Sequence, residues 1–386
     1  MTEVYLDNAA TTRALPSVVE AVSRALAHAY GNPSSLHRKG MEAEAILKEA
    51  RGLLARILDV SAGEIVFTSG GTESNALAIK GTAYARRRRG RHLVTTRIEH
   101  SSVLSAFRDL EAEGFSVTYL PVDREGRVDP ADVRAAVSDE TTLVSVMMVN
   151  NEIGTVQPIG AIARAAREKR PDVVVHVDAV QALGVMPVRP KELGVDLVSV
   201  SGHKIHGPKG VGALYVRKGL QIQPLFGKGS QEGGLRSGTE NVPGIAGFGA
   251  ALRALAEETG EERERLRSLR ERLITELLEI EGARLNGARG EGAAPHIANF
   301  SFPGVRGEVL VHALEERSVY VSTGSACTSR TVAVSHVLKA LGLPEEALES
   351  SIRISLSKLT TEDEIAFAVA AIKDAVASLR RMLSRR

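Results

Sequence analysis

The sequence has no tryptophan, a single cysteine and few aromatic residues among its 386 positions. Phe, Trp and Tyr make up 4% of the chain, which leaves little surface for stacking nucleic-acid bases. The formal net charge of +2, from 49 Lys and Arg against 47 Asp and Glu, gives no bulk attraction to nucleic acid either. A lone Cys327 excludes an intrachain disulfide and a cysteine cage for zinc or an iron–sulfur cluster. We therefore expect neither a nucleic-acid binder nor a disulfide scaffold.

Long hydrophobic runs are also missing. The longest useful apolar run, Leu143 to Val149, is far shorter than the roughly 20 residues of a membrane-spanning helix. The segment from Met1 to Asp7 carries an acid where a secretory signal carries positive charge. A lone thiol fits a reducing compartment. These features predict a cytoplasmic protein with no membrane contact.

Apolar, β-branched runs alternate with helical patterns through most of the first 250 residues, which is typical of βαβ units around a parallel sheet. Seven such runs predict strands over residues 65–68, 93–96, 117–120, 143–149, 173–177, 197–200 and 211–216. Apolar residues that return at three- and four-residue steps predict helices over 17–30, 41–58, 73–88, 101–112 and 159–169. The sequence therefore predicts an α/β fold with a mostly parallel seven-stranded sheet.

The pattern changes after the glycine-rich stretch from Gly227 to Gly238. Ala, Leu and charged residues at helical spacing predict one connecting helix over 245–279. Beyond it we expect strands over 298–302, 319–322 and 351–356 and helices over 308–316 and from residue 362. We expect a large domain over residues 13–255, and a smaller α+β domain built from residues 1–12 and 256–386.

Small residues follow the first predicted strand of the sheet and open the next helix, in Thr68-Ser-Gly-Gly-Thr-Glu-Ser74. Backbone N–H groups can approach an anion closely there, and the helix N-terminus adds partial positive charge. The amides of Gly71, Thr72 and Glu73 and the Thr72 hydroxyl are therefore candidate phosphate ligands. A plain strand-to-helix turn with a good N-cap explains these residues about as well.

Two further predicted strands lead to residues of opposite charge. Asp178 ends one strand and Lys204 follows the next, so both lie where parallel strands bring their carboxyl ends together. Taken singly, Asp178 fits a helix N-cap equally well and Lys204 fits an exposed lysine. His203 and His206 lack a carboxylate or thiol partner in their motif, so we expect no metal site. A phosphate cradle, an acid for a pyridine nitrogen and a lysine for an aldehyde are together what pyridoxal 5'-phosphate requires.

Three other residues are candidates for the chemistry. His100 follows a predicted strand and could lie over a cofactor ring as an acid or base, although a polar residue at a helix start is the commoner explanation. Cys327 lies in a run of small and polar residues without apolar periodicity, which favours a reactive thiol over a packed one. Arg353 interrupts a strand pattern; it could bind a carboxylate with its planar fork or be an edge-strand surface charge.

Eight segments in this order resemble the cysteine desulfurases of the NifS/IscS type, in the class V aminotransferase group of fold-type I pyridoxal-phosphate enzymes. They are residues 5–12, 31–37, 67–75, 149–154, 176–181, 201–210, 236–241 and 324–327. The surroundings of Cys327, Gly-Ser-Ala-Cys-Thr-Ser, resemble the long-loop group of these enzymes, which passes sulfur to scaffold proteins.

The resemblance implies a role for each candidate. Lys204 would bond to the cofactor aldehyde, Asp178 would meet the pyridine nitrogen, Gln181 would lie near the ring oxygen, and His100 would stack on the ring. The phosphate would be held by Thr72, Ser201 and His203, with Thr239 reaching in from the other subunit of a homodimer. Substrate would be bound by Arg353, through its carboxylate, and by Asn32 and Asn151; Asn151 also lies beside the cofactor.

The activity implied is conversion of L-cysteine to L-alanine, with sulfur carried as a persulfide on Cys327. The acceptor would be an iron–sulfur scaffold protein or another sulfur acceptor, with possible cluster ligation by Cys327 during transfer. The alternatives are a selenocysteine lyase or other β-elimination enzyme that uses the same cofactor, an aminotransferase, and a cofactor-binding scaffold without catalysis.

Overall fold

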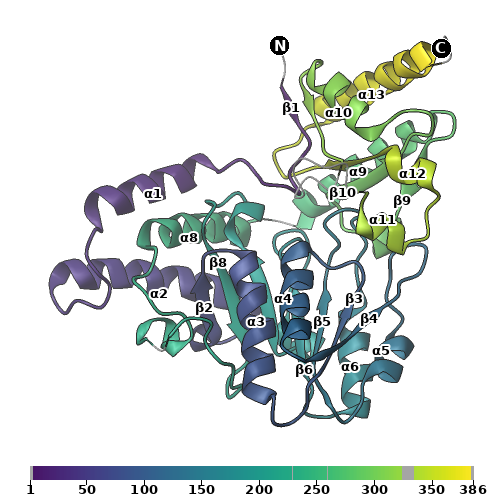
Figure 1. Cartoon of the computed structure of the whole chain (residues 1–386). Coiled ribbons are helices and arrows are strands. Elements are labelled where there is room, and N and C mark those ends of the chain that lie inside the picture. Colours follow the sequence, from purple (N-terminus) through teal and green to yellow (C-terminus); the bar gives the residue numbers. More distant parts are fainter. Residues whose placement is uncertain (1–2, 228, 259, 324–333, 384–386) are drawn as a thin grey trace.

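The computed structural model describes residues 3–227, 229–258, 260–323 and 334–383 (Figure 1). Its centre is a seven-stranded sheet in the order β2-β8-β7-β6-β5-β3-β4. The strands are β2 (Ile65–Thr68), β3 (His92–Thr96), β4 (Ser116–Leu120), β5 (Thr141–Met147), β6 (Val174–Asp178), β7 (Leu197–Ser201) and β8 (Gly212–Val216). Only β8 runs antiparallel to its neighbours, so the predicted mostly parallel seven-stranded sheet is confirmed.

Helices cover both faces of this sheet. One face packs against α3 (Gly71–Arg86) and α4 (Ser101–Ala112). The other packs against α2 (Arg38–Leu58), α5 (Pro130–Ala136), α6 (Ile159–Lys169) and α8 (Val242–Ala256), and α1 (Pro16–His28) lies on α8. Neighbouring strand residues alternate between the two cores; Leu143 belongs to one and Val144 to the other. Burial on both faces explains why these strands are continuous apolar runs in the sequence.

A second unit lies above the carboxyl end of the sheet, at the upper right of Figure 1. Its antiparallel sheet has the order β12-β10-β9, and β1 pairs with β11 beside it. Its elements are β1 (Val4–Tyr5), α9 (Gly260–Leu277), β9 (Arg284–Asn286), β10 (Ile297–Ser301), α10 (Gly307–Glu315), β11 (Val319–Tyr320), β12 (Ser351–Ser355) and α13 (Glu362–Leu383). Its separate core joins Val4 and Leu6 to residues between Leu266 and Val376. The second unit thus has an apolar core of its own, and the expected division into two domains with a boundary near residue 255 stays a prediction.

The single helix expected over 245–279 is wrong. The structure has α8 ending at Ala256 and α9 beginning at Gly260. Gly260 is a weak helix former in the middle of the predicted segment. Two short helices of the second unit, α11 (His336–Ala340) and α12 (Glu345–Glu349), and the turn α7 (Pro190–Leu193) are too short to show a periodic pattern in the sequence.

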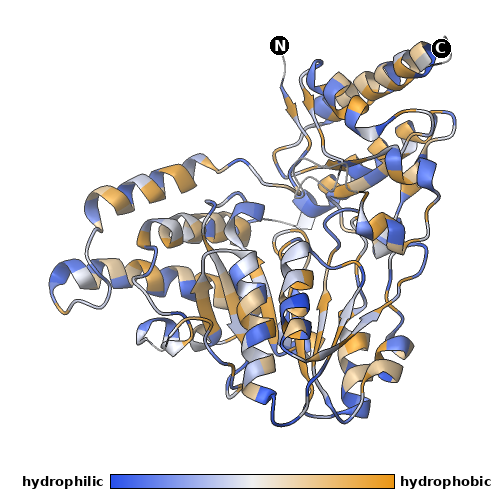
Figure 2. Ribbon diagram, in the orientation of Figure 1, coloured by the Kyte–Doolittle hydropathy of each residue, from blue (hydrophilic) through white to orange (hydrophobic). Residues whose placement is uncertain are grey.

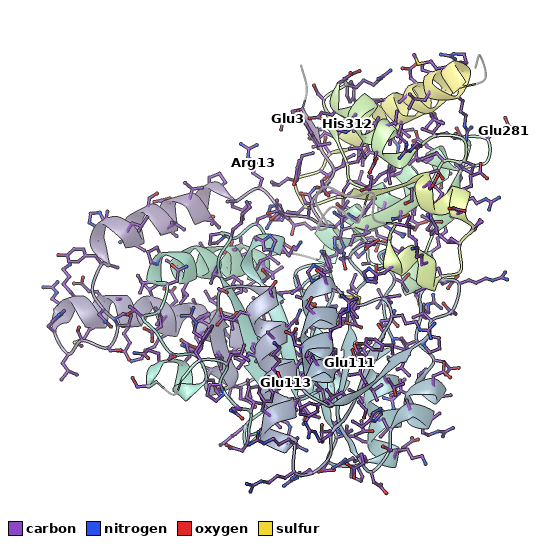
Figure 3. The ribbon with its side chains drawn as sticks, viewed as in Figure 1. Glu3, Arg13, Glu111, Glu113, Glu281 and His312 are labelled. Atoms are coloured by element: carbon purple, nitrogen blue, oxygen red, sulfur yellow. The ribbon has the colours of Figure 1, made fainter. Side chains whose placement is uncertain are left out.

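Hydropathy follows this layering. In Figure 2 the central strands are largely hydrophobic, whereas the covering helices carry hydrophilic residues as well. Exposed charged side chains such as Arg13, Glu111 and Glu281 lie on the outside of the molecule (Figure 3). Over the described ranges, none of the helices has the length and apolar character needed to cross a bilayer.

Candidate active site

The carboxyl ends of two adjacent parallel strands place the two oppositely charged candidates. Asp178 is the last residue of β6, and Ser201 is the last residue of β7. Lys204 ends the single 3-10 turn that follows β7. Because β6 and β7 pair in parallel, with Asp178 opposite Ser199, both strands deliver these residues to the same edge of the sheet.

Asp178 is buried and held by two hydrogen bonds. Its Oδ2 accepts from Asn75 Nδ2 at 2.8 Å, and its Oδ1 accepts from the Val180 amide at 3.0 Å. Asn75, in α3, also donates to Ser102 Oγ at 3.0 Å. These bonds fix the carboxylate in one orientation at the mouth of the site.

His100 caps the N-terminus of α4. Its Nδ1 accepts from the Ser102 amide at 3.2 Å and lies 2.9 Å from Ser102 Oγ. Burial lowers the His100 pKa, and the Lys204 charge lowers it further, while Asp178 opposes both. The ring is therefore neutral at pH 7, and since Nδ1 accepts, its proton sits on Nε2.

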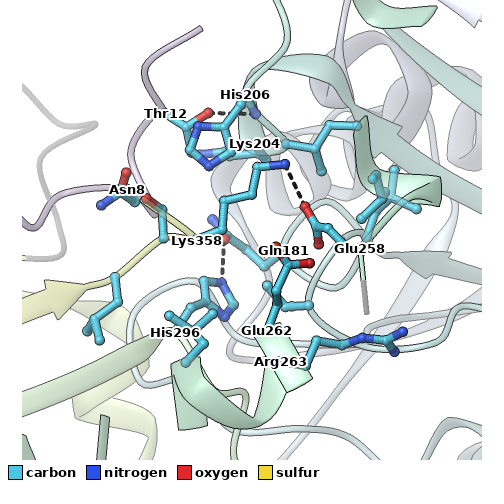
Figure 4. A pocket seen from close by; sticks show the side chains of 18 of the residues that line it. Asn8, Thr12, Gln181, Lys204, His206, Glu258, Glu262, Arg263, His296 and Lys358 are labelled. Atoms are coloured by element: carbon cyan, nitrogen blue, oxygen red, sulfur yellow. Dashed lines mark hydrogen bonds and ion pairs between the residues drawn. The ribbon is translucent and has the colours of Figure 1, made fainter. Parts of the chain in front are cut away.

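Lys204 contacts the N-terminal segment of the chain. Its Nζ donates to the Ala9 carbonyl, and to the Ala10 carbonyl at 2.8 Å. Gln181 Nε2 donates to the same Ala9 carbonyl at 2.9 Å, and its Oε1 lies 3.3 Å from His296 Nε2. Lys204 and Gln181 line one pocket (Figure 4).

The start of α3 carries the residues predicted to bind an anion. The first-turn amides of a helix have no intrahelical partner, and Gly71 is the first residue of α3. A Cβ on Gly71 would lie 2.7 Å from Val180 Cγ2, so glycine allows the start of α3 to pack closely against Val180. Ser201 Oγ is buried beside it without a hydrogen-bond partner anywhere in the described chain. An orphaned hydroxyl next to unpaired amides fits a phosphate.

The other predicted phosphate ligands differ in their environments. Thr72 is exposed at the start of α3. The Glu73 carboxylate accepts from the Ser69 amide at 2.7 Å and pairs with Arg236 at 3.1 Å, which leaves only its amide for an anion. His203 Nδ1 lies 3.2 Å from Thr11 Oγ1, and burial with the Lys204 charge lowers the His203 pKa to about 4. The His203 ring is therefore neutral at pH 7.

Arg353 lies in the middle of β12, with its side chain 4% exposed. Its Nη1 donates to the Asn151 carbonyl at 2.9 Å, and its Nη2 donates to Asp7 Oδ1 at 2.8 Å. Its Nε is buried and has no partner within the described residues. Arg353 and Asn151, two of the predicted substrate ligands, are thus in direct contact. The contact uses the backbone carbonyl of Asn151 and not its side chain.

Two predicted residues stand apart from this cluster. Asn32 is exposed in the loop between α1 and α2, where its Oδ1 accepts from the Ser34 amide at 2.9 Å. Thr239 is exposed shortly before α8. Within the described ranges, no hydrogen bond joins either of them to Lys204, Asp178 or Arg353.

Cys327 lies outside the described residues, but both flanks of its segment contact the site. On one side, Ser322 exchanges backbone hydrogen bonds of 3.1 and 2.6 Å with Arg353. On the other, His336 Nε2 lies 2.9 Å from the carbonyl oxygen of Glu99, the residue before His100. The residues on either side of the Cys327 segment therefore lie next to Arg353 at one end and next to Glu99, the neighbour of His100, at the other.

The structure adds three residues, Asn75, Asp7 and His296, that the sequence analysis did not single out. Asn75 and Asp7 fall inside quoted motifs, but their partners lie 103 and 346 positions away. His296, which is buried against Gln181, has no motif around it. In the sequence, these residues are marked only by being polar among small or apolar neighbours. That pattern does not show which residue each of them contacts. In the described part of the chain, no three His, Cys, Asp or Glu side chains cluster as metal ligands would.

The sequence and the fold were compared with those of known proteins, and the matches agree with one another. The family described as Aminotransferase class-V matches residues 4–367. The chain is 47% identical over 379 residues to the cysteine desulfurase IscS of Dictyoglomus turgidum, covering 98% of this chain and 95% of that protein. A solved NifS-like protein superposes with a TM-score of 0.92 at 40% identity, covering 98% of this chain and all of the other. A structure described as SspA in complex with cysteine gives a TM-score of 0.82 at 36% identity, covering 93% of this chain and all of the other.

Proposed function

The chain belongs to the class-V aminotransferase family, and from that premise we infer that it is a pyridoxal-phosphate-dependent cysteine desulfurase. It converts L-cysteine to L-alanine and transfers the sulfur to an acceptor. The observation that carries this conclusion is the convergence of Lys204, Asp178 and the orphaned Ser201 hydroxyl at one sheet edge. The likeness to relatives named as cysteine desulfurases over nearly the whole chain supports it.

The residues at this edge suit the cofactor. Asp178 would meet its pyridine nitrogen, Lys204 its aldehyde, and Ser201 with the first-turn amides of α3 its phosphate. Pyridoxal phosphate supplies an electron sink for the bond broken at the substrate's α-carbon. The hydrogen bonds from Asn75 and Val180 keep Asp178 oriented toward that position.

Two side chains at the site, His100 and Lys204, are placed to move protons. His100 carries its proton on Nε2 and accepts at Nδ1. Either Lys204 Nζ or His100 would remove the α-proton. The Ala9 and Ala10 carbonyls hold the Lys204 ammonium close to the site.

Sulfur transfer uses Cys327. Its thiolate attacks the substrate sulfur, so that a sulfur–sulfur bond forms and the substrate's carbon–sulfur bond breaks. The electron pair of that bond stays with the β-carbon, which takes up a proton and becomes the methyl group of alanine. The contacts of Ser322 with Arg353 and of His336 with Glu99 support this role, because both flanks of the Cys327 segment lie at the site.

The remaining assignments extend the proposal. The protein acts as a cytoplasmic homodimer in which Thr239 contacts the cofactor phosphate of the other subunit, and Asn32 contributes to substrate binding. The persulfide passes to an iron–sulfur scaffold protein or another sulfur acceptor, with Cys327 able to ligate a cluster during transfer. Similarity to proteins named IscS supports the scaffold as acceptor.

The test is mass spectrometry of the Cys327 peptide after purified holoenzyme is mixed with L-cysteine without reductant, with alanine quantified in the same tube. We expect one added sulfur on Cys327, matched by alanine. Cys327→Ala should bind cofactor but not turn over. Lys204→Ala should lose turnover and the absorbance of the covalently attached cofactor, whereas the exposed neighbour variant Lys209→Ala should behave as wild type. A Cys327→Ala enzyme with full activity would refute the persulfide step, and absence of alanine from wild type would refute the desulfurase.

A further inference from the structure

A carboxylate of the chain already occupies the arginine assigned to the substrate. We propose that Asp7 is a positioning and specificity-determining residue that shares the Arg353 guanidinium with the substrate carboxylate and so sets the KM for the amino acid. This inference rests on the proposed function, because it assumes that Arg353 binds substrate.

Only some of the hydrogen-bond donors of the Arg353 guanidinium have a partner in the described residues. Asp7 Oδ1 accepts from Nη2 at 2.8 Å, and the Asn151 carbonyl accepts from Nη1 at 2.9 Å. Nε is buried, and the described residues offer it no acceptor. A buried donor without a partner is costly, so the Nε side of the guanidinium is the edge prepared for an outside oxygen.

Asp7 is held in place on the second unit. It forms a β-bridge with Ser355, two residues beyond Arg353 on β12. Tyr5 Oη donates to the Asp7 carbonyl at 3.2 Å, and the Asn8 amide donates to the Ser355 carbonyl at 3.3 Å. Because the backbone on both sides is tied down, the carboxylate stays beside Arg353 when a ligand arrives.

Two consequences follow from a fixed carboxylate at this position. Asp7 holds the guanidinium in one orientation, which favours a ligand that approaches the Nε edge. It also neutralises part of the Arg353 charge and repels a second carboxylate, which weakens substrate binding. With the Arg353 side chain 4% exposed and that of Asp7 22% exposed, solvent screens this repulsion only in part.

The test separates charge from orientation. Asp7→Asn keeps an oxygen for Nη2 and removes the charge. We expect the KM for L-cysteine to fall on the order of tenfold, with kcat changed far less, and the inhibition constant of L-alanine to fall in parallel. Inhibition by cysteamine, which has no carboxylate, should not change. Asp123→Asn, in an exposed turn, is the matched control and should keep the wild-type constants.

An unchanged or raised KM in an Asp7→Asn enzyme that still makes alanine would overturn the role of Asp7. A wild-type enzyme that makes no alanine would instead refute the proposed function. If Asp7→Asn does not fold, Asp7→Ser removes the same charge with a smaller side chain, and the KM and the L-alanine inhibition constant should move in the same direction.

Discussion

Asn75 Nδ2 donates a 2.8 Å hydrogen bond to Asp178 Oδ2, which ties the first turns of α3 to the end of β6. Asn75 is 1% exposed and Asp178 5%. The helix proposed to bind the cofactor phosphate therefore also orients the acid proposed to meet the pyridine nitrogen. The groups proposed to hold the two ends of the cofactor are thus joined by a direct hydrogen bond.

Loss of this bond should weaken cofactor binding. A hydrogen bond to a charged group contributes about 1.5 to 3 kcal/mol, so we expect Asn75→Ala to lower pyridoxal-phosphate affinity by roughly 10- to 100-fold. Titration of the apoprotein with cofactor, followed by absorbance, measures this. Asn286→Ala is the matched control, because Asn286 is equally buried and bonded but lies in the second unit. Equal cofactor affinities in both variants would contradict the assignment.

The anion cradle should not tolerate a single added methyl group. In Gly71→Ala the new Cβ would lie 2.7 Å from Val180 Cγ2, so Val180 or the start of α3 must move. We expect cofactor affinity to fall at least tenfold in an equilibrium titration. Gly52→Ala, in helix α2 with open space around its Cβ, should keep wild-type affinity and gain about 0.5 to 1 kcal/mol of stability. Normal cofactor binding by Gly71→Ala would show that the phosphate lies elsewhere.

Arg353 should be irreplaceable by lysine. A guanidinium can contact Asp7, Asn151 and a ligand carboxylate at once because its donors form a planar fork, whereas an ammonium is a point charge. We expect Arg353→Lys to raise the KM for L-cysteine by 1 to 2 orders of magnitude, about 1.4 to 2.8 kcal/mol, with cofactor absorbance unchanged. Steady-state kinetics measure this change in KM. A wild-type KM in Arg353→Lys would show that Arg353 does not bind the substrate.

Acid should destabilise the fold through His176. This ring is buried between Ser145 Oγ at 2.8 Å and Ser199 Oγ at 2.9 Å, and burial lowers its pKa to about 3. Between that value and the ordinary pKa of about 6.5, the unfolded chain binds a proton that the folded chain does not. The free energy of unfolding therefore falls as the pH drops through this window, by up to about 1.4 kcal/mol per pH unit.

Urea unfolding of wild type and His176→Gln at pH 7, 6, 5 and 4 tests this expectation. The variant should be less stable at pH 7 but lose less stability on acidification. His312→Gln, at an exposed position, should follow the wild-type profile. Parallel pH profiles for wild type and His176→Gln would mean that His176 does not contribute to the acid sensitivity.

The sequence by itself determined the elements and the edge at which the chemistry gathers. Apolar runs and helical spacing are local properties, so each predicted strand of the large sheet was found, and α4 and α6 begin and end where expected. Asp178 and Lys204 could be brought together in advance because parallel strands share their carboxyl edge.

The partnerships across the chain were decided by the tertiary structure. Asp7 meets Arg353 across 346 positions, and Lys204 meets the Ala10 carbonyl across 194. No local period encodes such contacts, because they arise when the N-terminal segment is pinned to β12 by packing and by hydrogen bonds to Ser355. The sequence thus determined which groups are available, and packing of the second unit over the sheet decided which of them face one another.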